Sequence, residues 1–354
     1  MPLQLSTGSL DEATEWLSKD GSPAIRYWAH RDLKGNLVDD EEILKLQHQI
    51  AGWSPVADLL AKQDRKGYWA HPEDCYWPKW SATVWSLILL AEMGISPKHA
   101  SVVAGCEYFL KVAMAQDNSW PPKSMSEEES YRLLWEPCVT GNMARTLAVF
   151  GYGRDPRVRS MFEFLVRNQL PDGGWNCDIG EWGVKIHHSS FMSTIEPLWA
   201  FSELDQSLWP KGAKEVVENA AEFMLVHRLY KSDRTGKTIE DEWTKLHFPL
   251  FYFYDILHGL RVLVDLGYGG DERVSDALHI LKSKQLPDRT WPMESTYLNA
   301  LSRNYNKDPS TGSWREERRE NSAEIPDIYH RLGRVGEPNP WITLNAIRIL
   351  RKLA

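Results

Sequence analysis

The chain alternates two kinds of apolar segment along almost its whole length. Segments of the first kind are apolar nearly all round, which is typical of buried helices; they cover residues 22–33, 80–94, 138–153, 190–204, 253–269 and 341–354. Segments of the second kind carry one apolar stripe, and in 156–168 it is formed by Val158, Met161, Phe162 and Leu165. They cover residues 10–19, 41–62, 98–115, 156–168, 212–228 and 272–285. The pattern predicts six inner and six outer helices, and no segment shows the alternation of a strand.

One short phrase recurs between an outer segment and the next inner segment. It reads QDRKGYW from Gln63 to Trp69, QLPDGGW from Gln169 to Trp175, QLPDRTW from Gln285 to Trp291 and, in a shortened form, QDNSW from Gln116 to Trp120. Recurrence at about 50 to 60 residues indicates an array of like units. We therefore predict an all-α fold, a single (α/α)6 toroid of six helical hairpins over residues 1–354, with a central cavity.

The two ends of the chain bear on how such a ring closes. Ser9 and Glu12 form a capping-box pattern before the first outer helix, and the last inner helix, 341–354, has no outer partner after it. We expect the N-terminal helix to pack beside the C-terminal one. Residues 296–340 form an insert that is too long for an ordinary connection. We expect either a lid over a site or disorder there.

Composition narrows the class of protein further. The net charge of −8 excludes the basic face that nucleic acid or an anionic membrane requires. No apolar run approaches the roughly 20 residues that span a bilayer, and the first residues lack the pattern of a signal peptide. Four cysteines in 354 residues do not make a disulfide framework. We expect a cytoplasmic protein with reduced thiols and see no signature of a partner protein.

The recurring phrase resembles the QW motif of the squalene–hopene and oxidosqualene cyclases. Their toroid is shared with the β subunits of protein prenyltransferases, and similar toroids occur among polysaccharide lyases. The cyclases carry a D-x-D-D proton donor at the start of an inner helix. This chain has no D-x-D-D; it reads Tyr252-Phe253-Tyr254-Asp255 there. Asp255 is the acid that remains to act as a donor, or it caps the helix that follows.

The prenyltransferase resemblance implies a zinc site. Those β subunits hold zinc with an Asp-x-Cys at one inner-helix start and a His at a later one. Here Glu136-Pro137-Cys138 occupies such a start, and His188 follows one repeat later. Glu136, Cys138 and His188 are thus the implied ligands, and a buried thiol with a capping histidine is the alternative. Cys177, Asp178 and His187 form a second candidate metal cluster, which we rank below the first.

The starts of the inner helices gather at one mouth of a toroid, which predicts the residues around the cavity. The candidate acids and bases are Asp255, His188, His247 and Glu136, and the candidate substrate contacts are Trp77, Trp80, Tyr252, Tyr254, Trp341, His187 and Arg31. Aromatic faces suit a hydrophobic, isoprenoid-like substrate whose cationic intermediates they stabilise. The same residues also suit a sugar. Glu136 with Asp255 is then the hydrolytic pair, and Arg31, Lys79 and Arg145 are the cations that a lyase needs.

Three functions remain open at this point. The first is an enzyme that acts on a small hydrophobic or isoprenoid-like substrate, as the resemblance implies. The second is a carbohydrate-active lyase or hydrolase on the same scaffold. The third is a toroid that binds a ligand without chemistry. No cofactor is certain, and zinc is the one that the resemblance implies.

Overall fold

The inner and outer helices alternate as predicted. In the computed structural model, which describes residues 7–19, 21–37, 40–114, 119–121, 133–177, 188–298, 302–307, 314–319 and 325–354, the inner helices are α2 (Pro23–Trp28) with its π-helical continuation η1 (Ala29–Leu33), α5 (Thr83–Met93), α7 (Pro137–Val149), α9 (Phe191–Glu203), α11 (Ile256–Asp265) and α14 (Pro340–Lys352). The outer helices are α1 (Thr7–Lys19), α3 (Glu41–Gly52) with α4 (Ser54–Ala61), α6 (Ala100–Ala113), α8 (Pro156–Arg167), α10 (Ala213–Val226) and α12 (Ser275–Ser283).

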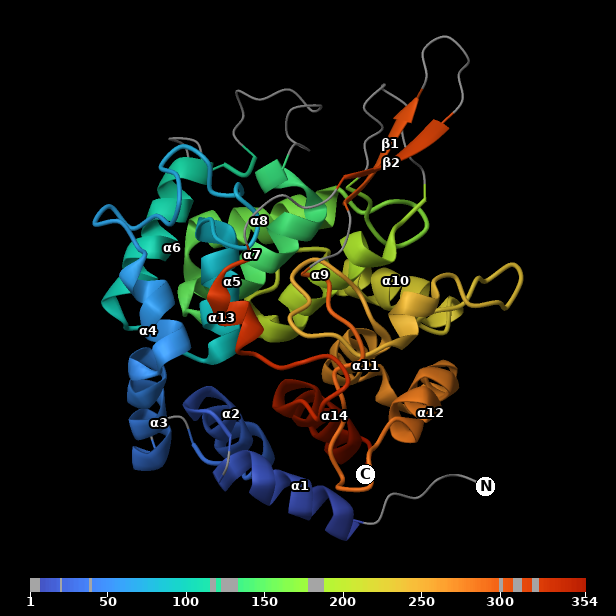
Figure 1. The fold of residues 1–354 in the computed structure, drawn as a ribbon. Coiled ribbons are helices and arrows are strands. Elements are labelled where there is room, and N and C mark those ends of the chain that lie inside the picture. Colours follow the sequence, from blue (N-terminus) through green and yellow to red (C-terminus); the bar gives the residue numbers. More distant parts are fainter. Residues whose placement is uncertain are drawn as a thin grey trace.

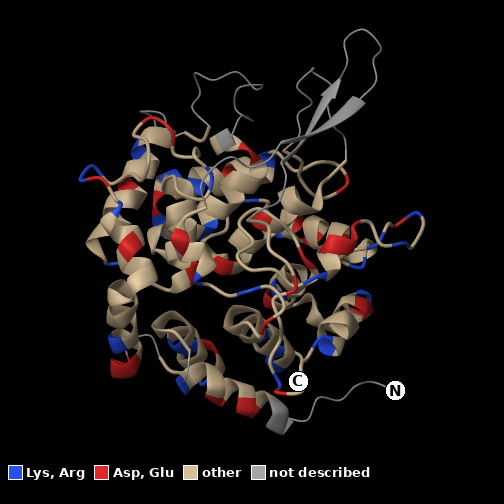
Figure 2. Ribbon diagram, viewed as in Figure 1, with Lys and Arg blue, Asp and Glu red and all other residues tan. Residues whose placement is uncertain are grey.

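Short elements join these helices. They are the 3₁₀ turns η3 (Leu133–Trp135), η4 (Tyr152–Arg154), η5 (Gln206–Leu208), η6 (Asp241–Thr244), η7 (Tyr268–Gly270) and η8 (Glu272–Val274), the helix α13 (Asp327–His330) and the strands β1 (Ser302–Lys307) and β2 (Trp314–Arg319). Among the described helices, none is both long and apolar enough to cross a bilayer. Acidic and basic residues are interspersed along the helices seen in Figure 2.

The inner helices form a closed ring. Helix α5 packs on α7, α7 on α9, α9 on α11, α11 on α14 and α14 on α2. The ring closes between α2 and α5, where Trp28 Nε1 donates to the carbonyl of Glu92 over 2.7 Å. Helix α1 packs against both α14 and α2 (Figure 1), and Arg351 Nη2 lies 2.9 Å from Asp11 Oδ1. The predicted closure of the toroid by its two terminal helices is therefore confirmed.

The three full copies of the recurring phrase make equivalent hydrogen bonds. The indole Nε1 of Trp69, Trp175 and Trp291 donates to the carbonyl ten residues earlier, at the end of the preceding outer helix, over 2.8, 2.9 and 2.8 Å. The backbone N–H of each tryptophan donates to a threonine hydroxyl of the next inner helix, namely Thr83, Thr194 and Thr343. Each corner thus ties an outer helix to the inner helix that follows.

The first two corners also reach the next outer helix. Gln63 Nε2 donates to the carbonyl of Ser101 in α6 over 2.8 Å, and Gln169 Nε2 donates to that of Val216 in α10 over 2.7 Å. Gly67 and Gly173 approach the same helices, with φ of 101° at each. A Cβ at Gly173 would lie 2.5 Å from the carbonyl oxygen of Asn219, so glycine is required for this close approach.

The insert contains a β-hairpin, which the sequence pattern did not predict. Strands β1 and β2 pair antiparallel from Ser302 opposite Arg319 to Lys307 opposite Trp314, and the hairpin projects beyond one end of the barrel (Figure 1). The expectation of no strand was wrong here, because the sequences of both strands are mainly polar and show no apolar alternation.

The end of the insert packs on the barrel. Ile328 and Tyr329 of α13 are buried, and the Tyr329 hydroxyl donates to the carbonyl of Trp80 over 2.8 Å. Trp80 precedes α5, so this part of the insert covers the mouth at which the inner helices begin. We call this end the N-terminal mouth and the opposite one the C-terminal end.

A segment between α10 and α11 fills the lumen at its N-terminal mouth. We call residues 247–253 the plug. The ring of Phe248 stacks on Trp341 at 4.8 Å and that of Phe251 on Trp80 at 4.3 Å, measured between centroids. Asn142 Nδ2 in α7 donates to the carbonyl of Phe251 over 3.2 Å. The plug is thus held by three inner-helix regions, and the space left in the lumen lies on its C-terminal side.

Candidate functional site

A cavity lies between the plug and the inner helices. Part of it is open to solvent, and the space that it offers to the centres of water-sized spheres is about 30 Å³. Its wall is mainly apolar and is formed by the plug together with α5, α9 and α11; its polar residues are Glu92, His247, His258, Arg261 and Asn345. A mainly apolar cavity with a few convergent polar groups is the usual form of a small-molecule site. This is the candidate functional site.

Helical spacing brings polar residues of the apolar inner helices to the lumen. In α9, Glu196 lies one turn before the cavity residue Trp199, on the same face. In α11, His258 and Arg261 are spaced by three residues and both line the cavity. In α7, Arg145 places its guanidinium 3.4 Å from the centroid of the Trp199 ring. A cation over the face of an indole is a favourable arrangement, so α7, α9 and α11 meet at this tryptophan.

Glu196 is a fully buried carboxyl. Its exposed fraction is 0%, and neither carboxyl oxygen has a hydrogen-bond partner among the described residues. Burial raises the pKa of Glu196 well above its ordinary value, although the positive charge of Arg145 opposes that shift. Burial therefore favours the protonated, uncharged form of Glu196.

His258 is a buried base whose pKa is shifted in the opposite direction. Its ring meets Trp199 edge-on at 4.5 Å, and neither ring nitrogen makes a hydrogen bond of ordinary geometry within the described chain. Burial lowers the pKa of His258 well below its usual range, and the charges of Arg261 and Arg145 lower it further against a backbone acceptor at Phe253. His258 is therefore neutral and able to accept a proton. The lumen holds an acid and a base whose pKa values are pushed in opposite directions, which is typical of acid–base sites.

A second cluster lies at the N-terminal mouth. The ligand atoms of Glu136, Cys138 and Cys177 all lie within 4.8 Å of one another, and the Cys138 thiol donates to Glu136 Oε2 over 3.8 Å. The hydrogen bond with Cys177 is the largest cause that raises the pKa of Cys138, and burial adds to it. Lys79 lies beside the cluster, and its Nζ donates to the hydroxyl of Tyr252 over 2.7 Å.

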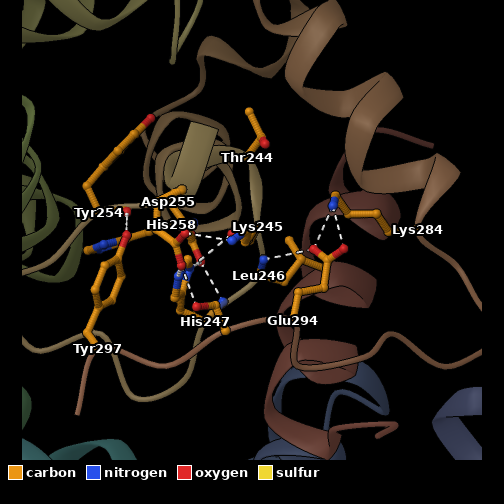
Figure 3. Close-up of polar contacts among 12 residues, drawn as sticks. Thr244, Lys245, Leu246, His247, Tyr254, Asp255, His258, Lys284, Glu294 and Tyr297 are labelled. Carbon is orange, nitrogen blue, oxygen red and sulfur yellow. Dashed lines mark hydrogen bonds and ion pairs between the residues drawn. The ribbon is translucent and has the colours of Figure 1, made fainter. Parts of the chain in front are cut away.

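Both carboxyl oxygens of Asp255 accept hydrogen bonds (Figure 3). It caps α11 by accepting from the backbone N–H of His258 over 2.8 Å, and it accepts from the N–H of His247 over 2.9 Å. His247 Nε2 lies 3.0 Å from Glu242 Oε1, and its Nδ1 lies 3.0 Å from the carbonyl of Lys245. Because both nitrogens face only oxygen acceptors, both are satisfied when both carry protons. This arrangement makes His247 and Asp255 a buried anchor for the plug.

The other predicted catalytic residues lie at the mouth. Glu136 belongs to the cysteine cluster. His188 is exposed, and its carbonyl accepts from Asn176 Nδ2 over 3.0 Å. Cys177, rather than His188, completes the group with Glu136 and Cys138. His187 and Asp178 lie outside the described residues.

The predicted substrate contacts are spread over the molecule. Trp80 and Trp341 are buried beneath plug residues, and Tyr254 is buried with its hydroxyl donating to the carbonyl of Leu229 over 2.7 Å. Trp77 is 41% exposed at the mouth, close to Lys79 and Tyr252. Arg31 lies at the opposite end, 4.0 Å above the ring of Trp28. The structure brings none of these side chains, as a group, to the cavity wall.

Sequence reasoning missed three polar residues of the cavity wall, His258, Arg261 and Asn345, and the buried Glu196 one turn before Trp199. They lie within segments that are otherwise apolar. The available signal was the presence of ionisable groups in predicted buried helices, where such groups are rare unless they are paired or functional.

No family model and no curated protein match this chain. Among solved structures, it is similar to a protein from Actinoplanes at 16% identity, covering 98% of both chains with a TM-score of 0.44. It is also similar to the type II terpene cyclase MstE from Scytonema. The apo form aligns at 13% identity over 98% of both chains with a TM-score of 0.43, and a complex with geranylgeranyl dihydroxybenzoate at 14% identity over 99% of both chains with a TM-score of 0.42. The likeness concerns the helical fold alone.

Proposed function

We propose that this protein is an enzyme that binds a small, mainly hydrophobic substrate of isoprenoid-like size in the central cavity and performs acid–base chemistry on it. The observation that carries the proposal is a pair of buried groups near Trp199 whose pKa values shift in opposite directions: the carboxyl of Glu196, one turn away in α9, and the imidazole of His258 on the cavity wall. Glu196 is the proton donor and His258 the acceptor.

The pKa directions constrain the reaction class. A carboxyl with a raised pKa is a weak acid, so it suits donation to a hydroxyl, epoxide or carbonyl oxygen rather than to an unactivated double bond. The absence of D-x-D-D in the sequence agrees with that limit. Isomerisation or elimination beside an oxygen function is the reaction class that these two groups support best.

Product analysis tests the proposal. Purified protein is incubated with C10 to C20 isoprenoid alcohols, epoxides and acids, and products are separated by gas chromatography with mass detection. We expect turnover of at least one substrate, and a loss of about 100-fold or more in Glu196→Gln and His258→Gln, within the range for general acid–base groups. Glu163→Gln, on exposed α8, is the matched control. Wild-type rates in both lumen variants would rule out the assigned roles.

We also propose a zinc site at the N-terminal mouth, formed by Glu136, Cys138 and Cys177. Tetrahedral zinc places sulfur and oxygen ligands roughly 3.5 to 3.8 Å apart, which the 3.8 Å between Cys138 Sγ and Glu136 Oε2 matches. Two thiolates and a carboxylate carry three negative charges, which zinc and the neighbouring Lys79 ammonium balance. When bound, zinc with these three protein ligands supplies a Lewis acid.

Metal analysis tests this site. We expect about one equivalent of zinc in the wild type and roughly a tenth of that in Cys177→Ser, with affinity that rises with pH because the raised pKa of Cys138 makes protons compete with the metal. Cys106→Ala, on α6, is the control. A protein without zinc whose melting temperature does not change in EDTA would exclude the site.

A further inference from the structure

The C-terminal end of the barrel holds four arginines and three acids, drawn from all six inner helices. The arginines are Arg31, Arg145, Arg261 and Arg348, and the acids are Asp32, Glu92 and Glu203. Burial raises the pKa of Glu203, but the four arginines outweigh it and lower that pKa, so Glu203 is charged. Burial lowers the pKa of Arg348 to about 10, which leaves it charged as well. These seven residues, four arginines and three acids, therefore carry one positive charge in excess.

Of these four arginines, Arg261 has the weakest contact with an acid. Asp32 pairs with Arg31 and with Arg348, and Glu92 lies 2.6 Å from Arg145 Nη1. Glu203 is 3.7 Å from Arg261 Nη2 and 3.8 Å from Arg145 Nε, so it is shared by two guanidiniums and hydrogen-bonded to neither. Arg261 therefore has no short acidic partner among the described residues, although it lines the cavity.

These arginines are not explained as caps that neutralise the C-terminal ends of helices. Arginine near a helix C-terminus commonly donates to the last carbonyls, and Arg351 does so by donating to the carbonyl of Leu33. The Nε groups of Arg145, Arg261 and Arg348 are buried, and within the described chain none has a hydrogen-bond partner. A buried charged donor without an acceptor is costly, which is typical of a binding site rather than of a cap.

We propose that the C-terminal side of the cavity binds the carboxylate of a mainly apolar ligand through Arg261, with Asn345 as the second donor. Asn345 Oδ1 accepts from Arg348 Nη1 over 2.8 Å, which leaves the amide NH₂ to donate. A planar guanidinium suits a carboxylate because it donates two parallel hydrogen bonds. The inference rests on the proposed function, since it gives the hydrophobic ligand of that same cavity an acidic end.

The charge balance favours a carboxylate over a diphosphate. One carboxylate neutralises the single excess charge, whereas a diphosphate brings two or three negative charges into a lumen that already holds Glu92 and Glu203. Uncompensated buried charge is strongly unfavourable. The apolar body of the ligand then lies against the plug and the side chains of Leu89 and Leu257, which form much of the remaining wall.

Three probes with the same C10 tail test the head group: geranic acid, geraniol and geranyl diphosphate, titrated into the protein by calorimetry. We expect geranic acid to bind at least 10-fold more tightly than either of the others. Arg261→Gln should weaken geranic acid by about 10- to 100-fold, as expected for a charge-assisted hydrogen bond, and leave geraniol unchanged. Arg261→Lys should retain part of the affinity. Arg159→Gln, on exposed α8, should change nothing.

The outcomes separate this inference from the proposed function. Equal binding of acid and alcohol, or equal losses for both in Arg261→Gln, leaves a hydrophobic site and overturns the carboxylate assignment. Tighter binding of the diphosphate also overturns it. Failure of all three probes to bind counts against the hydrophobic cavity itself, and with it against both proposals. Calorimetry of Arg261→Lys guards against a folding defect, because that variant keeps the charge.

Discussion

The outer corners and the lumen differ in whether their polar groups have hydrogen-bond partners. At the corners, polar groups are paired, and the pairing repeats: the indole, glutamine and threonine hydrogen bonds of Trp69 recur at Trp175. Asp155 with Arg157 and Glu107 recurs as Asp271 with Arg273 and Glu222. In the lumen, Glu196, His258 and the Nε of Arg261 are buried without a hydrogen bond of ordinary geometry among the described residues.

The difference separates stability from function in one chain. Repeated, fully paired contacts lower the free energy of the folded state unit by unit, as in other repeat architectures. Buried polar groups without partners cost stability and persist in folded proteins mainly at functional sites. Substitutions at the corners should therefore destabilise the protein, whereas the same change in the lumen should leave its stability unchanged or raise it.

The largest expected effect is at a corner tryptophan. Trp175→Ala removes a fully buried indole and its hydrogen bond to Leu165, and we expect a loss of about 3–5 kcal/mol in the free energy of unfolding. Urea denaturation followed by circular dichroism measures it. Trp77→Ala, at the exposed mouth, should cost less than about 1 kcal/mol. A similar loss in both variants would show that the corners are not the stabilising elements.

Glu196→Gln should raise the free energy of unfolding rather than lower it, by an amount that depends on pH. The unfolded carboxyl releases its proton near 4.5, whereas the folded one keeps it to higher pH because burial raises its pKa. The unfolded state then binds fewer protons, so wild-type stability falls as pH rises from 4.5 to the folded pKa, by up to about 1.4 kcal/mol per pH unit.

Denaturation at several values from pH 5 to pH 8 measures this slope. Glu196→Gln cannot ionise, so its stability relative to the wild type should increase steadily over that range. Glu163→Gln, which is exposed on α8, should run parallel to the wild type. If wild type and Glu196→Gln ran parallel instead, Glu196 would already be ionised in the folded state, and its role as a proton donor would fail.

The corners could be predicted from the amino-acid pattern more readily than the lumen could. Hydrophobic periodicity and the recurring phrase predicted the helices, their order and the closure, because each corner depends on local spacing. Glu136 and Cys138 were suggested by the prenyltransferase resemblance, since they are two residues apart at one helix start. Cys177 comes to them from the loop after Trp175, and its place depends on how that loop packs against α7. The plug was missed because Phe248, Phe251 and Phe253 read as an apolar approach to a helix, while α11 begins only at Ile256.

Asp155→Asn tests the ion-pair network of Asp155, Arg157 and Glu107 on the outer helices, where we expect an effect on stability of intermediate size. The hydrogen bond from Arg157 is the main cause that lowers the pKa of Asp155, so its contribution is present above pH 3.8 and is lost as pH falls through the lowered pKa. Asparagine still caps α8, and we expect a loss of about 1 kcal/mol at pH 7 that disappears at low pH. Thermal unfolding at pH 7 and pH 3 checks this. A loss that is the same at both values would assign the effect to packing instead.

The smallest effect compares two corners at one equivalent position, which is Gly173 in one and Arg289 in the other. Arg289 has φ of 70° where Gly67 and Gly173 have 101°. Gln285 Nε2 donates to the carbonyl of Arg289 over 3.2 Å, as its counterparts do. Arg289→Gly removes the strain of a left-handed backbone conformation at an arginine, but glycine also raises the conformational entropy of the unfolded chain. We expect a net gain of about 0.5 kcal/mol in the free energy of unfolding. Gly173→Ala should instead cost more than about 2 kcal/mol, because its Cβ meets the carbonyl of Asn219 at 2.5 Å. Paired urea midpoints decide it: equal and small changes at both positions would mean that contact with the next outer helix does not fix glycine in this phrase.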